Sequence, residues 1–289
     1  MQNKKYLLLI LLLLALIQLM GCADNVYANA NIISINAPNI FKVKKISPFK
    51  IATTLQTSTS AHSFNNSKHS AESNLALAAS YLLSNQSTIK FATSVTKNLK
   101  GLKKQEMENS SISISKSLKK INNSAEILAS IAAIIPSKQS TRETKTLYTK
   151  FTLTPSLILD LSSIGMKNVS ATLFSSIGRG FYQYTRAHDG IANSRYTLKN
   201  GLVLAWSFIE GWGLSTTFSN TSAWTFSGTQ KKDQYEFAQE LSYTLNKFAT
   251  LSFGHLMGGK TFGYDGQTSN IQVFDANDSS FYTAVGILF

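Results

Sequence analysis

The chain has 289 residues, a formal net charge of +13 at pH 7 and a single cysteine, which excludes a disulfide within one chain. The charge is unevenly placed: residues 31–140 carry fourteen Lys and four Glu, whereas residues 141–289 carry twelve Lys and Arg against ten Asp and Glu. Aromatic residues show the opposite bias, because all three Trp and thirteen of the seventeen Phe follow residue 140. Two regions of different composition therefore meet near Pro136–Thr144.

The amino terminus predicts export. Lys4 and Lys5 precede an apolar run from Tyr6 to Met20. Because a spanning helix needs about 20 apolar residues, this run fits a cleaved secretion signal over residues 1–22 better than an anchor. The mature protein should leave the cytoplasm, so we expect no nucleic-acid partner.

Two processing routes compete at the end of this segment. Leu19-Met20-Gly21-Cys22 is similar to a lipobox, in which Cys22 becomes the lipidated first residue, although Met20 is bulkier than the usual small residue. Val26-Tyr27-Ala28 and Ala28-Asn29-Ala30 suit an ordinary signal peptidase and would move cleavage as late as residue 30. Mass spectrometry of the mature amino terminus distinguishes the two: a lipidated Cys22, or an unmodified residue further along.

The basic half predicts a partly disordered segment followed by helices. Residues 23–70 are low in complexity and rich in Ser, Asn, Thr and Lys. Residues 71–136 predict amphipathic helices, because one set of apolar residues follows a 4-3-4-3 spacing: Ile114, Leu118, Ile121, Ala125, Leu128, Ala132 and Ile135. These helices pack on each other, or else form a coiled-coil element that binds a partner chain or self-associates.

Residues 144–289 instead show the two-residue period of β-strands. In one segment the alternating partners are Trp212, Leu214, Thr216 and Phe218 against Gly213, Ser215, Thr217 and Ser219. Pro155 predicts a tight turn at Thr154-Pro155-Ser156. In the last segment one face carries Phe281, Thr283, Val285, Ile287 and Phe289, and the other carries Ser280, Tyr282, Ala284 and Gly286.

This final strand, closing on Phe289, resembles the C-terminal strand of bacterial outer-membrane β-barrels. The resemblance covers roughly the second half of the chain. It implies a location in the outer membrane among its lipids, and recognition by the barrel-assembly machinery through Phe281, Val285, Ile287 and Phe289. About eight antiparallel strands, with up to ten as the alternative, fit residues 144–289.

Connection lengths suit such a barrel. Glu210-Gly211 and Asn246-Lys247 are short and fit a periplasmic rim, whereas Arg186–Ser194, Ser227–Gln234 and Gly258–Ser279 fit the outer rim. The rival is a soluble β-sandwich. It does not account for aromatic residues near strand ends, which suit the two membrane interfaces.

Five charged residues occupy the alternate strand positions that should face the lumen, and they predict a charge network inside the barrel. They are Lys150, Asp160, Lys199, Glu236 and Glu240. An eight-stranded interior is just wide enough for side chains, so these charges should pair and fill it. The alternative is a narrow ion path, which would need ten or more strands.

We therefore expect a non-enzymatic outer-membrane β-barrel with a structural or interaction role and a basic helical region on the envelope side. The alternative is a small channel or porin-type transporter. An envelope lipid hydrolase is the third hypothesis: His255 is similarly placed to the histidine of lipid A deacylase barrels, but Met257 stands where they carry a serine. The sequence predicts no catalytic residue, no cofactor and no metal site.

Overall fold

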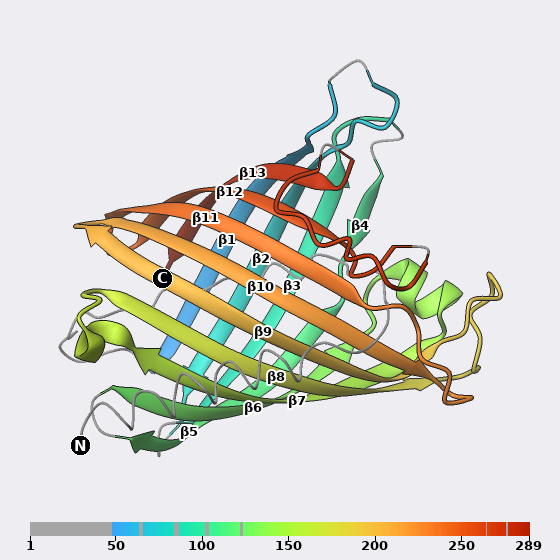
Figure 1. Ribbon diagram of the computed structural model, residues 1–289, viewed down its shortest axis with the longest axis horizontal. Coiled ribbons are helices and arrows are strands. Elements are labelled where there is room, and N and C mark those ends of the chain that lie inside the picture. The colour runs from blue at the N-terminus through green and yellow to red at the C-terminus, as the bar shows by residue number, and fades with distance from the viewer. Residues whose placement is uncertain are drawn as a thin grey trace.

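The computed structural model describes residues 48–63, 66–83, 87–101, 104–121, 124–263, 265–275 and 277–289. These residues form one antiparallel sheet (Figure 1). Its strands are β1 (Phe49–Ser60), β2 (Ala71–Leu82), β3 (Ser87–Asn98), β4 (Gln105–Met107), β5 (Ser110–Ile121), β6 (Ala125–Ile135), β7 (Leu147–Asp160), β8 (Val169–Tyr182), β9 (Ser194–Ile209), β10 (Trp212–Thr225), β11 (Gln234–Asn246), β12 (Ala249–Lys260) and β13 (Ser279–Leu288).

The sheet closes into a barrel. β1 pairs with β13 from Ala52↔Leu288 to Ser60↔Ser280, and with β2 on its other side. β4 pairs only with β3, just beyond the stretch in which β3 pairs with β5. In the described part of the chain, the closed ring therefore has twelve strands, not about eight.

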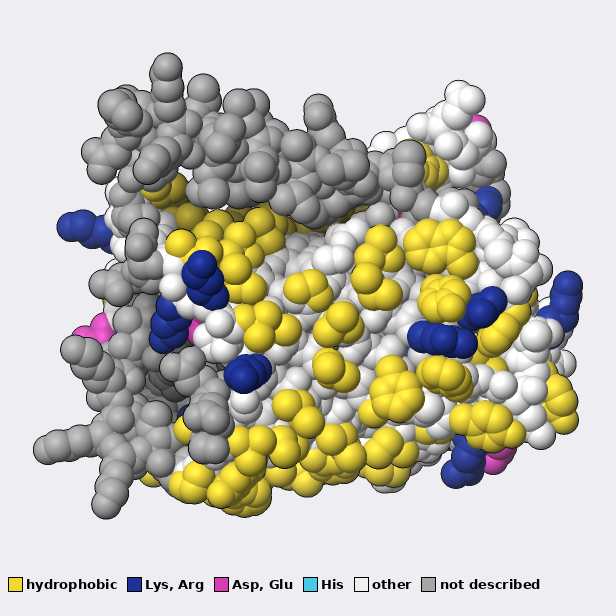
Figure 2. Space-filling model, turned by 90° about the horizontal axis from the view of Figure 1, so that it is seen from below, with side chains coloured by type: hydrophobic (Ala, Val, Ile, Leu, Met, Phe, Trp, Pro, Cys, Tyr) yellow, Lys and Arg dark blue, Asp and Glu magenta, His cyan; other side chains and the backbone are white. Residues whose placement is uncertain are grey.

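Alternate residues of each strand face opposite sides of the wall. On one of these two sides, large apolar side chains are exposed to the surroundings; examples are Leu55 (50% exposed), Ile131 (58%) and Phe253 (53%). Figure 2 shows apolar side chains spread across one outer face, with Lys and Arg gathered toward its two ends. Apolar groups exposed in this way are stable only against hydrocarbon, so this parity faces lipid and the other faces the lumen.

The two rims differ in their connections. Residues 210–211 and 247–248 join β9 to β10 and β11 to β12, at the rim where the carboxyl terminus lies (Figure 1). Gly211 takes a φ of 80° there, which suits glycine in a tight turn. Residues 183–193, 226–233 and 261–278 form longer loops at the opposite rim. The connections named from the sequence thus lie at two different rims, although the eight residues 161–168 between β7 and β8 lie at the rim of the short turns.

The prediction of helices over residues 71–136 was wrong. This segment forms β2 to β6, and β6 pairs directly with β7 from Ala125↔Leu159 to Ile134↔Lys150. The helices of the described residues are two single turns, η2 (Ser140–Thr144) and η3 (Leu161–Ile164), and none of them is long or apolar enough to cross a membrane. The barrel begins at Phe49, inside the segment expected to be partly disordered. The secretion signal and Cys22 lie outside the described residues.

The predicted turn at Pro155 was also wrong, because β7 runs through it. Pro155 pairs with Ala129 of β6, and the β7–β8 pairing is interrupted between Leu153 and Ser156, where proline has no N–H to give. The Thr154 hydroxyl bridges this gap by donating to Ser176 Oγ of β8 at 2.8 Å.

Candidate functional site: the lumen of the barrel

The lumenal wall carries mostly small and hydroxylated side chains. β5 contributes Ser111, Ser113 and Ser115, and β1 contributes Thr54 and Ser58, all of them partly exposed. Barrel diameter grows with strand number, and an eight-stranded barrel is just filled by its side chains. Twelve strands lined with small residues therefore leave space for water.

Two lumenal aromatic rings lie against the wall because glycines make room for them. A Cβ added to Gly201 of β9 would overlap the ring of Phe174 from β8. A Cβ added to Gly254 of β12 would overlap the ring of Tyr282 from β13. Both rings therefore lie flat along the neighbouring strand, which keeps the lumen open.

Lys150 lies over a third glycine. Its Cε would be 2.6 Å from a Cβ on Gly178 of β8, so the lysine stem runs across β8 toward Thr197 of β9. Lys199 and Lys145 both lie close enough to repel its ammonium group. Among the described residues, no carboxylate oxygen lies within 4.0 Å of this ammonium.

Lys199 and Glu236 form an ion pair on the lumenal wall. The Lys199 ammonium donates to Glu236 Oε2, and Ser219 Oγ of the intervening β10 donates to the same oxygen at 3.2 Å. The two side chains are 26% and 20% exposed. The ion pair is partly buried, and together with the hydrogen bond from Ser219 it holds both side chains along the wall.

Glu240 is held by a tyrosine instead. Tyr282 Oη donates to Glu240 Oε2 at 2.8 Å, across β12. On the far side of β13, Ser58 Oγ of β1 donates to Glu72 of β2 at 3.3 Å. The acidic side chains of this wall thus accept hydrogen bonds from hydroxyl groups.

The predicted charge network is only partly assembled. Lys150, Lys199, Glu236 and Glu240 lie on the lumenal parity, and one pair among them makes a direct ion pair. Asp160 lies at the end of β7, where its carboxylate accepts the backbone N–H of Ser162 at 2.9 Å and caps η3. Phe174 and Tyr282 were missed because nothing in their own strands indicates the glycine opposite.

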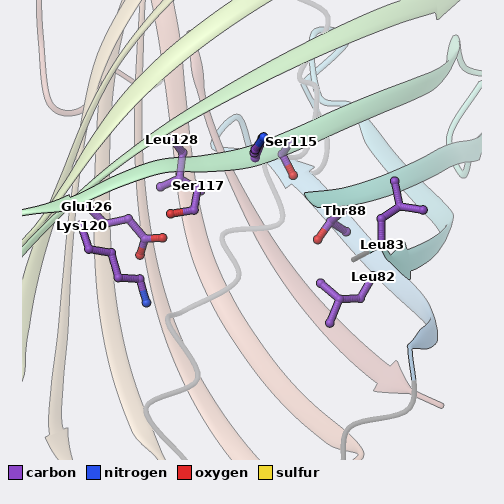
Figure 3. A pocket seen from close by; sticks show the side chains of 9 residues that line it. Leu82, Leu83, Thr88, Ser115, Ser117, Lys120, Glu126 and Leu128 are labelled. Carbon is purple, nitrogen blue, oxygen red and sulfur yellow. The ribbon is translucent and has the colours of Figure 1, made fainter. Parts of the chain in front are cut away.

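A cavity of about 370 Å³ opens at the rim of short turns (Figure 3). β5 pairs with β3 only as far as Lys116↔Ser87, so its last residues continue with β6 alone. Leu82 and Leu83 line one side of this notch, and Lys120 and Glu126 line the other. The lumenal wall is therefore hollowed locally at this rim.

The loops at the opposite rim are tied to one another. Asn193 Nδ2 donates to the carbonyl oxygens of Lys145 and Tyr184, and the Lys231 ammonium donates to the carbonyl oxygen of Ala192. Burial lowers the pKa of Lys231, and repulsion from Lys145 adds to this, while Asp189 acts in the opposite direction. These contacts join three loops into one outer mouth.

His255 has a serine partner that the sequence did not reveal. His255 Nε2 lies 3.0 Å from Ser279 Oγ, on the lipid-facing side of β12 and β13. Ser279 is only 2% exposed, and its Oγ also accepts the backbone N–H of Asp275 at 3.1 Å. This pair anchors the β12–β13 loop to the wall. Within the described residues, no group of three or more His, Cys, Asp or Glu could hold a metal ion.

The carboxyl-terminal residues face lipid. Phe281, Val285 and Ile287 alternate with lumenal residues along β13, and Phe289 follows as the last residue, 70% exposed. These side chains therefore contact hydrocarbon. Their recognition by the barrel-assembly machinery stays a prediction.

No protein-family model and no curated protein matches the sequence. Solved structures share the fold, among them a channel and a porin. An outer-membrane channel from Pseudomonas putida F1 has a TM-score of 0.60 and 11% identity, covering 87% of this chain and 99% of that one. The NanC porin has a TM-score of 0.54 and 9% identity, covering 82% of this chain and 98% of that one.

These findings correct the expected function. The structural role assumed a narrow barrel filled by paired charges, whereas the ring has twelve strands, and two of the structures that share its fold are a channel and a porin. They favour the alternative of a small channel. With its closed ring and apolar outer belt, the chain has the fold of a porin-like outer-membrane β-barrel.

Proposed function

We propose that the protein is a porin-type channel through which small polar solutes diffuse across the outer membrane. The observation that supports this proposal is the composition of the lumenal wall, which leaves the interior unfilled. Its wall is built from small hydroxylated residues, and its aromatic rings at Phe174 and Tyr282 lie flat over Gly201 and Gly254. A barrel that used these rings to fill its interior would have no need of the glycines.

The size of the ring limits what can pass. Barrels of sixteen or more strands leave wide aqueous channels, and eight strands leave none. Twelve strands lie between these cases. The lumenal charges carry both signs, and water-filled surroundings stabilise them without a complete set of ion pairs. A narrow, hydrated path for small polar solutes follows.

Conductance in planar lipid bilayers tests the proposal. Purified protein that shows heat-modifiable migration on a gel should insert and give discrete, ohmic current steps in potassium chloride. The same preparation after boiling, and detergent alone, should give none. Folded protein that inserts without any current step would contradict the channel.

A further inference from the structure

An arginine lies on the lipid-facing side of the wall, within a row of aromatic residues. The strand register places four residues of this row side by side on β7, β8, β9 and β10: Phe151, Arg179, Tyr196 and Trp224. Ile177, two residues before Arg179 on β8, is 56% exposed and faces lipid, so Arg179 faces lipid as well. Toward one end of the outer surface, cationic side chains lie directly among apolar ones (Figure 2).

The row marks the level of the lipid headgroups. Tyr196 and Trp206 are ten residues apart on the lipid-facing side of β9, and Trp206 lies near the rim of short turns. At about 3.4 Å per residue and a strand tilt of roughly 40°, the two rings are about 26 Å apart across the membrane. This separation is close to the height of the apolar band, about 25 Å, that aromatic girdles enclose. Tyr196, and Arg179 beside it, therefore lie at the membrane interface on the side of the long loops.

Aromatic rings orient two guanidinium groups at this level. The Arg179 Cζ lies 5.0 Å from the centroid of the Phe181 ring and 5.7 Å from that of the Tyr196 ring. The Arg195 Cζ lies 5.1 Å from the centroid of the same Tyr196 ring. In the part of the chain that the structure describes, no carboxylate oxygen lies within 4.0 Å of either guanidinium. Cation–π contacts thus hold both groups while their N–H donors lack an anionic partner.

An aliphatic strip lies next to these cations, on the side of the membrane centre. Leu153, Ile177 and Leu198 pair across β7, β8 and β9, one lipid-facing position further from the rim than the aromatic row. A molecule that matches both parts has an anionic headgroup and acyl chains. Phosphate suits the guanidinium, because its oxygens accept two parallel N–H bonds.

We propose that Arg179 and Arg195 bind lipid A, the phosphorylated glycolipid of the outer leaflet, through its phosphate groups. Its acyl chains lie over the aliphatic strip. The long loops place the aromatic row in this leaflet. Arginine on a lipid-facing strand costs less stability at the interface than at the midplane, and a lipid phosphate lowers that cost further. The site lies outside the lumen, so it does not depend on the channel function.

Competition between two forms of the lipid tests the proposal. Folded protein in detergent micelles is mixed with equal amounts of lipid A and of the same lipid with its phosphates removed, and native mass spectrometry counts the bound molecules of each. Wild-type protein should retain the phosphorylated form about tenfold more often, a difference of about 1.4 kcal/mol. An excess of inorganic phosphate should not displace it, because free phosphate makes no contact with the aliphatic strip.

Variants assign the preference to the two arginines. Arg179→Gln should lower it to about twofold or less, and Arg195→Gln should lower it by a smaller factor. Arg179→Lys should restore only part of it, because lysine keeps the charge but not the planar pair of donors. Arg142→Gln is the matched control: Arg142 is exposed at the same rim but is paired with Glu143 at 3.3 Å, so its loss should leave the preference unchanged. Heat-modifiable migration shows that each variant is folded.

Equal retention of the two lipid forms by folded wild-type protein would overturn the proposal, and so would a preference that Arg179→Gln leaves intact. Displacement of lipid A by inorganic phosphate would show a site for free anions and not for a lipid. Potassium chloride conductance is measured separately on the same preparations, so failure of the lipid site and failure of the channel are distinguishable.

Discussion

Replacing Gly201 with alanine is expected to reduce single-channel conductance to roughly half or less, since conductance depends on the free width of the lumen. The added Cβ would occupy the space of the Phe174 ring, and the Phe218 carbonyl oxygen, 3.0 Å away, closes the other side. The ring must then turn inward. Planar-bilayer recordings on the variant and on wild-type protein measure the effect.

Gly286→Ala is the control for this prediction. Gly286 also faces the lumen, but a Cβ there would meet no atom closer than 3.9 Å, so its conductance should match the wild type. Adding Phe174→Ala to Gly201→Ala should restore the current by removing the displaced ring. Equal conductance in Gly201→Ala and wild type would show that the ring does not limit the path.

Ile131→Arg is expected to destabilise the folded barrel by about 2–4 kcal/mol, the cost of arginine near the centre of a lipid-facing strand. Ile131 lies in the middle of β6, is 58% exposed and faces hydrocarbon. Urea unfolding in lipid vesicles, followed by tryptophan fluorescence, gives the free energy of unfolding.

Ala132→Arg, one residue further along, should cost much less stability because it points into the hydrated lumen, and it should narrow the channel instead. The helical interpretation of this segment makes the opposite prediction. In that interpretation Ala132 belongs to the apolar seam and Ile131 does not, so Ala132→Arg would be the damaging change. The order of the two free energies decides between them.

The barrel half was predictable because its strands alternate large apolar residues with small ones over eight or more positions. Trp212, Leu214 and Phe218 mark the lipid face of β10 clearly, and the structure places them there. The carboxyl-terminal strand likewise identified the membrane. The number of strands was wrong because the count began too late in the chain.

The first half was wrongly predicted as helical because its apolar residues fit a helical spacing as well as the two-residue period of a strand. Ser111, Ile112, Ser113 and Ile114 alternate strictly, which is typical of a strand, and Ile112 and Ile114 are the exposed members. The 4-3-4-3 spacing used Ile114 and Leu118 but left Ile112, Ile127, Ile131 and Ile134 off the seam. In short segments, such omissions are evidence against a helix.

The charged part of the candidate site was predictable residue by residue, but its geometry was not. Parity alone identified Lys199 and Glu236, yet their pairing depends on which strands lie two apart in the ring. The glycines opposite Phe174 and Tyr282 depend on register in the same way. Register is set by the closed sheet and cannot be deduced from one strand.

Because β1 is hydrogen-bonded to β13, the wall has an open side whenever β13 is not in place. A truncated chain that lacks β13 leaves two unpaired strand edges, on β1 and β12, each a row of unbonded amides and carbonyls that hydrocarbon cannot solvate. Such fragments cannot remain stably within lipid. Stable insertion therefore depends on β13, whose pairing with β1 and β12 removes both edges.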